Sequence, residues 1–200
     1  MILIALLILF IIIYFIPLYN PHNISNTEYV KSYDGNYYRV NSIYENKQEA
    51  SDILALLNAR INEIIQSLAD AYNFSNPKLQ MITKNILKRY KSKNLVENSP
   101  FNDNNDTSFV VNKGSTFAIC LREKNETYKF HDINILMFVV LHELSHLAIH
   151  GLGHDYEFWS TFKFILQFCE DKQLYYSINY NKYPQMYCGI LVNHNPNANN

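Results

Sequence analysis

The segment His142-Glu143-Leu144-Ser145-His146 constrains this chain more than any other feature, because it places two histidines four positions apart. In a helix of 3.6 residues per turn, such side chains lie on the same face. Two imidazoles in that arrangement can bind one metal ion, and Glu143 can act as general base on a water bound to the ion. The pattern predicts a catalytic zinc site with His142 and His146 as ligands and Glu143 as the catalytic residue.

Apolar residues recur at helical spacing around the two histidines, which is typical of a buried helix. They are Ile133, Leu136, Met137, Val140, Leu141, Leu144, Leu147 and Ala148. Asp132 is suited to cap the start of this helix, and Gly151 and Gly153 are suited to end it. We therefore expect a helix over about residues 133–150. Hydrogen-bonded core histidines are the alternative, but a glutamate between histidines at this spacing favours metal ligands.

A third ligand is expected, because a catalytic zinc ion usually has three protein ligands and keeps a fourth position for water. His154 is the preferred candidate, since the glycines before it allow the chain to fold back toward the helix. His150 continues the same helix, whose rise of about 5.4 Å per turn keeps three stacked histidines from reaching one ion. Glu157 and Glu170 are the carboxylate alternatives.

Several supporting roles stay open at the level of sequence. A donor to the oxyanion is expected, and the candidates are His150, Tyr183 and Tyr187. Asp155 is a candidate for orienting one of the ligand histidines. We expect Trp159 to pack beneath the loop that carries the third ligand.

The remaining patterns predict a mixed α+β fold in one domain. Residues 47–72 and the segment after Asn76-Pro77 have the spacing of amphipathic helices, and residues 158–169 show an apolar helical face. Residues 94–106 are polar and predict a loop. Residues 108–111 and 115–121 predict a β-hairpin before the histidine helix. Its second strand, as an exposed edge, is the candidate for pairing with an extended substrate, and an ordinary sheet strand is the alternative. The residues of this strand are Phe117, Ala118, Ile119, Cys120, Leu121 and Arg122.

The N-terminal part differs in character from the rest of the chain. Residues 1–19 carry no charge and are long enough to span a bilayer, and no cleavage site is evident after them, so we expect an uncleaved single-pass anchor. The side of the membrane stays open. Residues 20–37 are interpreted as a stalk or short hairpin around Asp34-Gly35, residues 38–196 as the folded domain and 197–200 as a polar tail.

Charge and cysteine content give no support to some classes of protein. The 17 basic and 18 acidic residues nearly balance, so charge gives no support for nucleic-acid binding. The three cysteines, Cys120, Cys169 and Cys188, are odd in number and lack the spacing of a cysteine zinc site. We expect buried thiols rather than disulfides.

The order of motifs resembles the WLM-domain metallopeptidases, relatives of the SprT/Spartan-like proteases, over residues 38–196. The resemblance rests mainly on the HELSH block and on Gly153-His154 with Phe158-Trp159. Weaker matches are Asn112-Lys113-Gly114, Cys120-Leu121-Arg122 and Tyr187-Cys188-Gly189.

This resemblance implies a small zincin-like protease fold, with zinc bound by His142, His146 and His154 and with Glu143 as the catalytic acid and base. Members commonly place the third histidine six positions after the second, whereas the interval here is eight. The sequence thus favours a membrane-anchored zinc metallopeptidase acting on a protein or peptide. The alternatives are a non-catalytic membrane-bound scaffold with a structural zinc site, and a protease for DNA–protein crosslinks as in family relatives.

Overall fold

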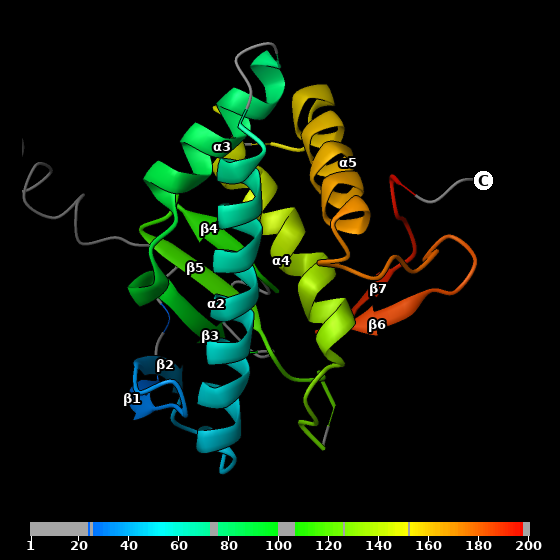
Figure 1. Ribbon diagram of the computed structural model, residues 1–200. Helices are drawn as coiled ribbons and strands as arrows, with labels where there is room; N and C mark the ends of the chain where they lie inside the picture. The colour runs from blue at the N-terminus through cyan, green and yellow to red at the C-terminus, as the bar shows by residue number, and fades with distance from the viewer. Residues whose placement is uncertain are drawn as a thin grey trace, which may run out of the picture.

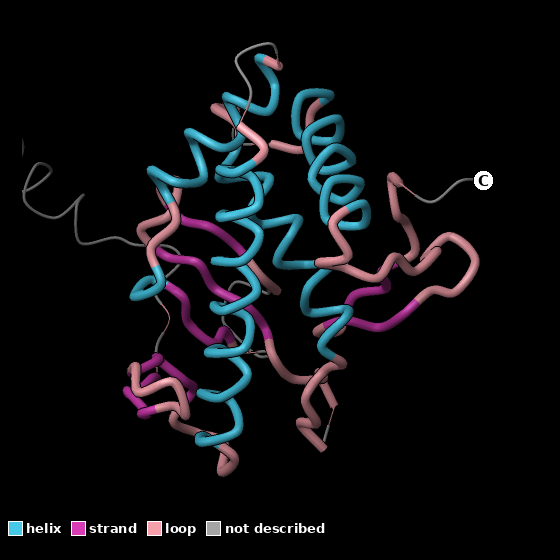
Figure 2. Tube along the Cα trace, in the orientation of Figure 1, coloured by secondary structure: helices cyan, strands magenta, loops and turns pink. Residues whose placement is uncertain are grey.

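The computed structural model describes residues 24, 26–72, 76–99, 107–125, 127–151 and 153–197. Within them a five-stranded sheet of order β1-β2-β3-β5-β4 is covered by helices, and a separate two-stranded hairpin lies to one side (Figures 1 and 2). The expected mixed α+β architecture is confirmed. The proposed anchor over residues 1–19 lies outside the described residues. In the described part of the chain, no helix combines the length and apolarity needed to cross a bilayer.

Two strands form an N-terminal hairpin, β1 (Thr27–Lys31) and β2 (Tyr37–Asn41), which are antiparallel to each other. The turn contains Gly35 at φ +83°, a conformation that glycine adopts without steric cost. β2 also pairs in parallel with β3 (Leu95–Asn98), so the hairpin is part of the main sheet rather than a separate stalk.

The strand β3 corrects part of the prediction of a loop over residues 94–106, of which residues 100–106 lie outside the described part of the chain. All four of its residues are buried, including Glu97. The carboxylate of Glu97 accepts hydrogen bonds from Arg122 Nε at 2.8 Å and from the backbone N–H of Asn41 at 2.7 Å. Arg122 in turn lies against the rings of Tyr44 and Phe130. A strand with polar residues is therefore buried because distant partners satisfy its carboxylate.

The edge of the sheet next to the histidine helix is β4 (Phe109–Val111), which is antiparallel to β5 (Thr116–Cys120). β5 also pairs in parallel with β3, so both of its sides are occupied. The expected edge strand was therefore wrong. The residues assigned to it are largely buried interior residues: Phe117, Ala118, Ile119, Cys120, Leu121 and Arg122. The alternation of a hairpin does not reveal which of its strands a third strand will join.

The described part of the chain has four α-helices: α2 (Lys47–Asp70), α3 (Pro77–Arg89), α4 (Ile133–Ala148) and α5 (Tyr156–Asp171). α2 contacts β1, β2 and β3, α4 contacts β4 and β5, and the two helices contact each other, so they cover the same face (Figure 1). α3 and α5 pack against α4. The hairpin of β6 (Gln185–Tyr187) and β7 (Ile190–Val192) follows α5. α4 is thus the central helix, and apolar neighbours hold it on several sides.

Candidate metal site and cleft

The helix α4 begins and ends close to where the sequence predicts. Asp132 caps its start, with a side-chain oxygen that accepts from the N–H of Asn134 at 2.8 Å. Nearly every apolar residue of the helix is buried. His142 and His146 lie one turn apart on one face and are half-buried, with ring centroids 5.1 Å apart.

The third histidine, His154, reaches this face from the connection between α4 and α5. Its Nε2 lies 2.9 Å from His142 Nε2 and 3.1 Å from His146 Nε2. The next residue, Asp155, caps α5 by accepting from the N–H of Phe158 at 2.9 Å. The capped start of α5 thereby fixes the position of the backbone next to His154.

The ring of Phe158 lies among all three imidazoles. Its centroid is 4.8 Å from that of His142, 4.3 Å from that of His146 and 4.5 Å from that of His154, and the side chain is fully buried. A rigid aromatic ring at this place limits the rotation of each imidazole. Phe158 therefore positions the three nitrogens on one side of the helix.

Two cationic side chains hold the end of α4 below the histidines. Lys113 Nζ donates to the carbonyls of His146 and Gly151. Arg89 Nη1 donates to the carbonyls of Leu147 and Ile149, both at 2.6 Å. Positive charge at a helix C-terminus satisfies carbonyls that have no partner within the helix.

Gly114 allows this close packing of the β4–β5 turn against the end of α3. It lies at φ +114°, and a Cβ atom there would be 2.3 Å from the carbonyl oxygen of Arg89. No other residue type fits without moving the backbone that supports the end of α4.

Burial sets the protonation of the three histidines. It lowers the pKa of His142 to about 3 and that of His146 to about 4, and the neighbouring imidazoles add to both shifts. Burial also lowers the pKa of His154. All three rings are therefore neutral at neutral pH, which is the form that binds a metal.

Glu143 is the buried acid of the site. Its side chain is 4% exposed, and burial raises its pKa to about 8. Its Oε2 atom is buried and has no hydrogen-bond partner among the described residues. A buried carboxylate oxygen without a partner is costly unless a water, an ion or a substrate group occupies the adjoining space.

The donor set fits a zinc ion. The three histidines are the one group of possible ligands found in the described part of the chain, and their ligand atoms lie within 4.8 Å of one another. Nitrogens bound to zinc at 2.0–2.1 Å and at tetrahedral angles are roughly 3.3 Å apart, close to the two separations given above. Three protein ligands beside an unpaired carboxylate are typical of open rather than closed zinc sites.

The other ligand candidates lie elsewhere. His150 is exposed, with its Nδ1 3.4 Å from Arg89 Nη2. Glu157 is in the first turn of α5, and Asp155 serves as the cap of that helix. Glu170 lies at the far end of α5, where Asn197 donates to its Oε2 at 2.7 Å. The structure therefore brings His154, and none of these four, together with the two histidines of α4.

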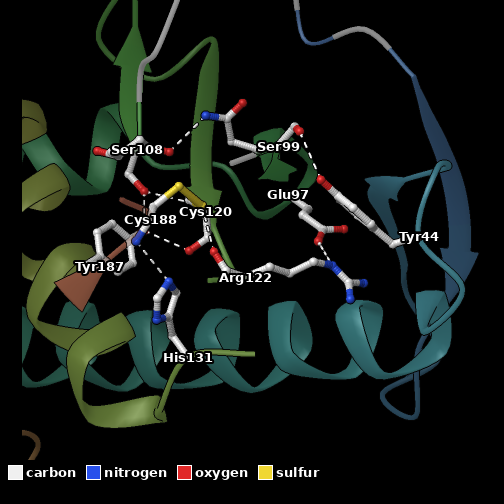
Figure 3. Close-up of a disulfide and its surroundings, with 11 residues drawn as sticks. Tyr44, Glu97, Ser99, Ser108, Cys120, Arg122, His131, Tyr187 and Cys188 are labelled. Atoms are coloured by element: carbon white, nitrogen blue, oxygen red, sulfur yellow. Dashed lines mark hydrogen bonds and ion pairs between the residues drawn. A yellow bond between two sulfur atoms is a disulfide. The ribbon is translucent and has the colours of Figure 1, made fainter. Parts of the chain in front are cut away.

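Tyr187 lies in a closed network rather than pointing freely at the histidines (Figure 3). Its hydroxyl donates to the carbonyl of Cys120 at 2.8 Å and is 2.6 Å from Ser108 Oγ, which accepts from the N–H of Cys120 at 3.0 Å. Because a phenol has one proton, Ser108 donates to Tyr187. Tyr187 therefore has no proton left for a substrate in this arrangement. Tyr183, the other tyrosine considered, is exposed and does not line the cavities described below.

A disulfide joins Cys120 to Cys188 beside this network, which corrects the expectation of three free thiols. The pair is 68 residues apart in the chain, so no local spacing could reveal it. Cys169 is the one free cysteine and is buried. The N–H of Cys188 also donates to His131 Nε2 at 3.0 Å. These contacts fix the β6–β7 hairpin to the end of β5.

Two cavities meet at the histidines and Glu143. The first has a volume of about 250 Å³ and runs along the edge strand β4, past Val110 and Lys113. The second, about 350 Å³, opens between α4, α5 and the β6–β7 hairpin. Both are lined by Ser108, His142, Glu143 and His154. A continuous cleft therefore passes the candidate metal site on both sides.

Most residues that line the two cavities were not assigned to the site from the sequence, and three of them are instructive. Ser108 was seen only as part of a strand, and His194 only as one of seven histidines. Trp159 was expected beneath the ligand loop. It does lie beside His154, at 5.9 Å between centroids, but it is also 38% exposed, lines the second cavity and contacts His194. No local pattern marks such residues, because the cleft forms only in the folded chain.

This combination defines a chain with a three-histidine candidate metal centre in a cleft, and comparison with known proteins gives its family. The WLM domain matches residues 78–195, well over half of the chain, and the protein belongs to the WLM domain family. An uncharacterised protein of Acanthamoeba polyphaga mimivirus is 36% identical over 169 residues, covering 84% of this chain and 83% of that protein.

Two further matches are more limited. An uncharacterised protein of Invertebrate iridescent virus 6 is 35% identical over 68 residues, covering 34% of this chain and 38% of that protein. The crystal structure of Wss1 from Saccharomyces cerevisiae is similar at a TM-score of 0.48 and 19% identity, covering 67% of this chain and 89% of Wss1.

Proposed function

We propose that this protein is a zinc-dependent peptidase whose ligands are His142, His146 and His154 and whose catalytic acid and base is Glu143. One observation carries the proposal: three neutral imidazole nitrogens converge beside a buried carboxylate oxygen that has no partner, at the meeting point of two cavities. Membership of the WLM domain family supports the same activity.

Bound zinc in such a site lowers the pKa of a coordinated water to about 7 and polarises the carbonyl of the substrate. Glu143 then has two tasks. Its Oε2 accepts a proton from the attacking water, and the same carboxyl later donates that proton to the amine that leaves. Burial raises the pKa of this carboxyl in the metal-free site, and the charge of a bound cation would oppose that shift and favour the ionised form that accepts the proton.

The edge strand β4 is the proposed docking site for the substrate backbone. No described strand pairs with its outer side, and Phe109 and Val110 line the cavity beside the histidines. An extended peptide can add to such an edge through main-chain hydrogen bonds, which do not require a particular side chain. This placement replaces β5, which the sequence had suggested.

The two alternative functions have less support. A structural zinc site is usually closed by four protein ligands, whereas three come together here among the described residues. A role on DNA–protein crosslinks gains nothing from a formal net charge of -1. The membrane anchor over residues 1–19 stays a prediction from sequence. Release of the full-length protein by carbonate extraction would contradict it.

Glu143→Gln is the test of the proposed activity, with Glu157→Gln as matched control. Glu157 is also a glutamate near the histidines, but it lines neither cavity. We expect Glu143→Gln to keep about one zinc ion per chain and to lose roughly 10²–10⁴-fold in the hydrolysis rate of a reduced and alkylated protein. Glu157→Gln should keep both zinc and activity. Undiminished hydrolysis by Glu143→Gln would refute the catalytic assignment.

A further inference from the structure

The larger of the two cavities has a mainly apolar lining beside the candidate metal site. It is walled by apolar side chains from three elements, α4, α5 and β7: Val139, Trp159, Phe162, Ile190, Leu191 and Val192. Apart from histidines, Glu143 is the one acidic or basic residue that lines it. A volume of about 350 Å³ lies at the lower end of the range for ligand pockets, roughly 300–1,000 Å³.

The smaller cavity is different in chemistry. It follows the backbone of β4 and is bordered by Asn112 and Lys113. The two sides of the cleft therefore offer a substrate different surroundings, one more polar and the other mainly apolar, with Glu143 lining both. A peptide that lies across the site would place the residues on either side of the bond to be cut in these two environments.

Part of the apolar wall is exposed to solvent. Leu191 is 54% exposed and Ile190 is 49% exposed. Single exposed apolar residues are common, but here they border one cavity that reaches the candidate catalytic residue. Covering them with an apolar side chain would remove apolar surface from water on both partners.

The wall is also held in place. The disulfide between Cys120 and Cys188 and the hydrogen bond from Tyr187 to Cys120 join the hairpin to β5 (Figure 3). A site that is formed before the ligand arrives loses less free energy in ordering when the ligand binds.

From these observations we propose that the apolar cavity is a specificity subsite, which takes one large apolar side chain directly adjacent to the scissile bond. The inference rests on the proposed peptidase function and names the class of substrate: extended peptides with a residue such as leucine or phenylalanine at one side of the cut. The opposite side of the cut, next to the smaller and more polar cavity, is less selective.

The test uses the full-length zinc-loaded protein and a set of peptides. The peptides differ only at the two positions that flank the cut. Leucine, serine, aspartate or lysine is placed at one of these positions at a time. Leu191→Asp places a charge at the mouth of the cavity on an exposed residue that the fold does not need buried. Met186→Asp is the matched control, because Met186 is the cross-strand partner of Leu191, is 58% exposed and does not line the cavity.

We expect the wild-type protein to cleave the leucine peptide roughly tenfold or more faster than the serine peptide, in kcat/KM, at one of the two positions. Leu191→Asp should abolish this preference and favour lysine, whereas Met186→Asp should keep it. Equal cleavage of all peptides by the wild type, or an unchanged preference in Leu191→Asp, would overturn the subsite while the peptidase function stands. Absence of any cleavage by the zinc-loaded wild type would instead overturn the peptidase function itself.

Discussion

Replacing Phe158 by leucine should weaken zinc binding in addition to destabilising the fold. The ring of Phe158 is fully buried and lies within 4.8 Å of all three imidazole centroids. A leucine fills part of the space but leaves the imidazoles free to rotate. Loss of a group that orients metal ligands typically costs 10–100-fold in affinity, or about 1.4–2.7 kcal/mol.

Phe117→Leu is the control for this experiment. Phe117 is equally buried, on β5, and packs edge-on against Tyr90 rather than against the histidines. Both variants should lose about 1–3 kcal/mol in the free energy of urea unfolding of the metal-free protein. Zinc affinity, measured by competition with a chromogenic chelator, should fall only in Phe158→Leu. Equal zinc affinities in the two variants would show that the ring does not position the ligands.

Three further predictions concern the metal site and its support. Gly114→Ala should destabilise the protein by about 2–4 kcal/mol, because its Cβ would meet the Arg89 carbonyl. Gly35→Ala, in the β1–β2 turn, should cost less, because a Cβ there has nothing within 4 Å. Equal losses of stability in chemical denaturation would contradict this prediction. His154→Ala should lose stoichiometric zinc in elemental analysis while His150→Ala keeps it, and zinc retained by His154→Ala would move the third ligand elsewhere. The metal-free protein should be most stable near pH 6.5. As the pH falls below 6.5, His142 and His146 take up protons in the unfolded chain. In the folded chain they stay neutral, because their pKa values are lowered to about 3 and about 4, so stability falls. Above pH 6.5, Glu143 keeps its proton in the folded chain, where its pKa is raised to about 8, but has lost it in the unfolded chain. Stability therefore falls as the pH rises toward 8. Urea unfolding after chelator treatment measures this, and a steady rise of stability from pH 5 to pH 9 would refute it.

The histidine helix could be read from the sequence because its signals are local. The spacing of His142 and His146, the apolar residues around them and the Asp132 cap all lie within 17 residues of chain. The choice of His154 as third candidate followed from the glycines before it, and the structure places its ring beside the other two. Signals of this kind depend only on helical geometry and turn chemistry.

The parts that sequence reasoning missed depend on partners far away in the chain. β3 looks like a loop because Glu97 is polar, and its burial depends on Arg122, 25 residues later, and on the backbone N–H of Asn41, 56 residues earlier. The edge position of β4 depends on β3 pairing with β5, which no pattern within the hairpin specifies. The apolar cavity likewise joins Val139 to Leu191, residues from two separate elements.

The disulfide between Cys120 and Cys188 has a practical consequence for anyone who produces this protein. Cross-links of this kind persist in oxidising surroundings and are kept reduced in most cytosols. A preparation from a reducing host would therefore hold the β6–β7 hairpin by hydrogen bonds and core packing without the cross-link, and batches with different thiol content would differ in how well the apolar wall is formed. Counting free thiols under denaturing conditions, one per chain in the cross-linked form and three in the reduced form, is thus the quality measurement to make before any kinetic comparison.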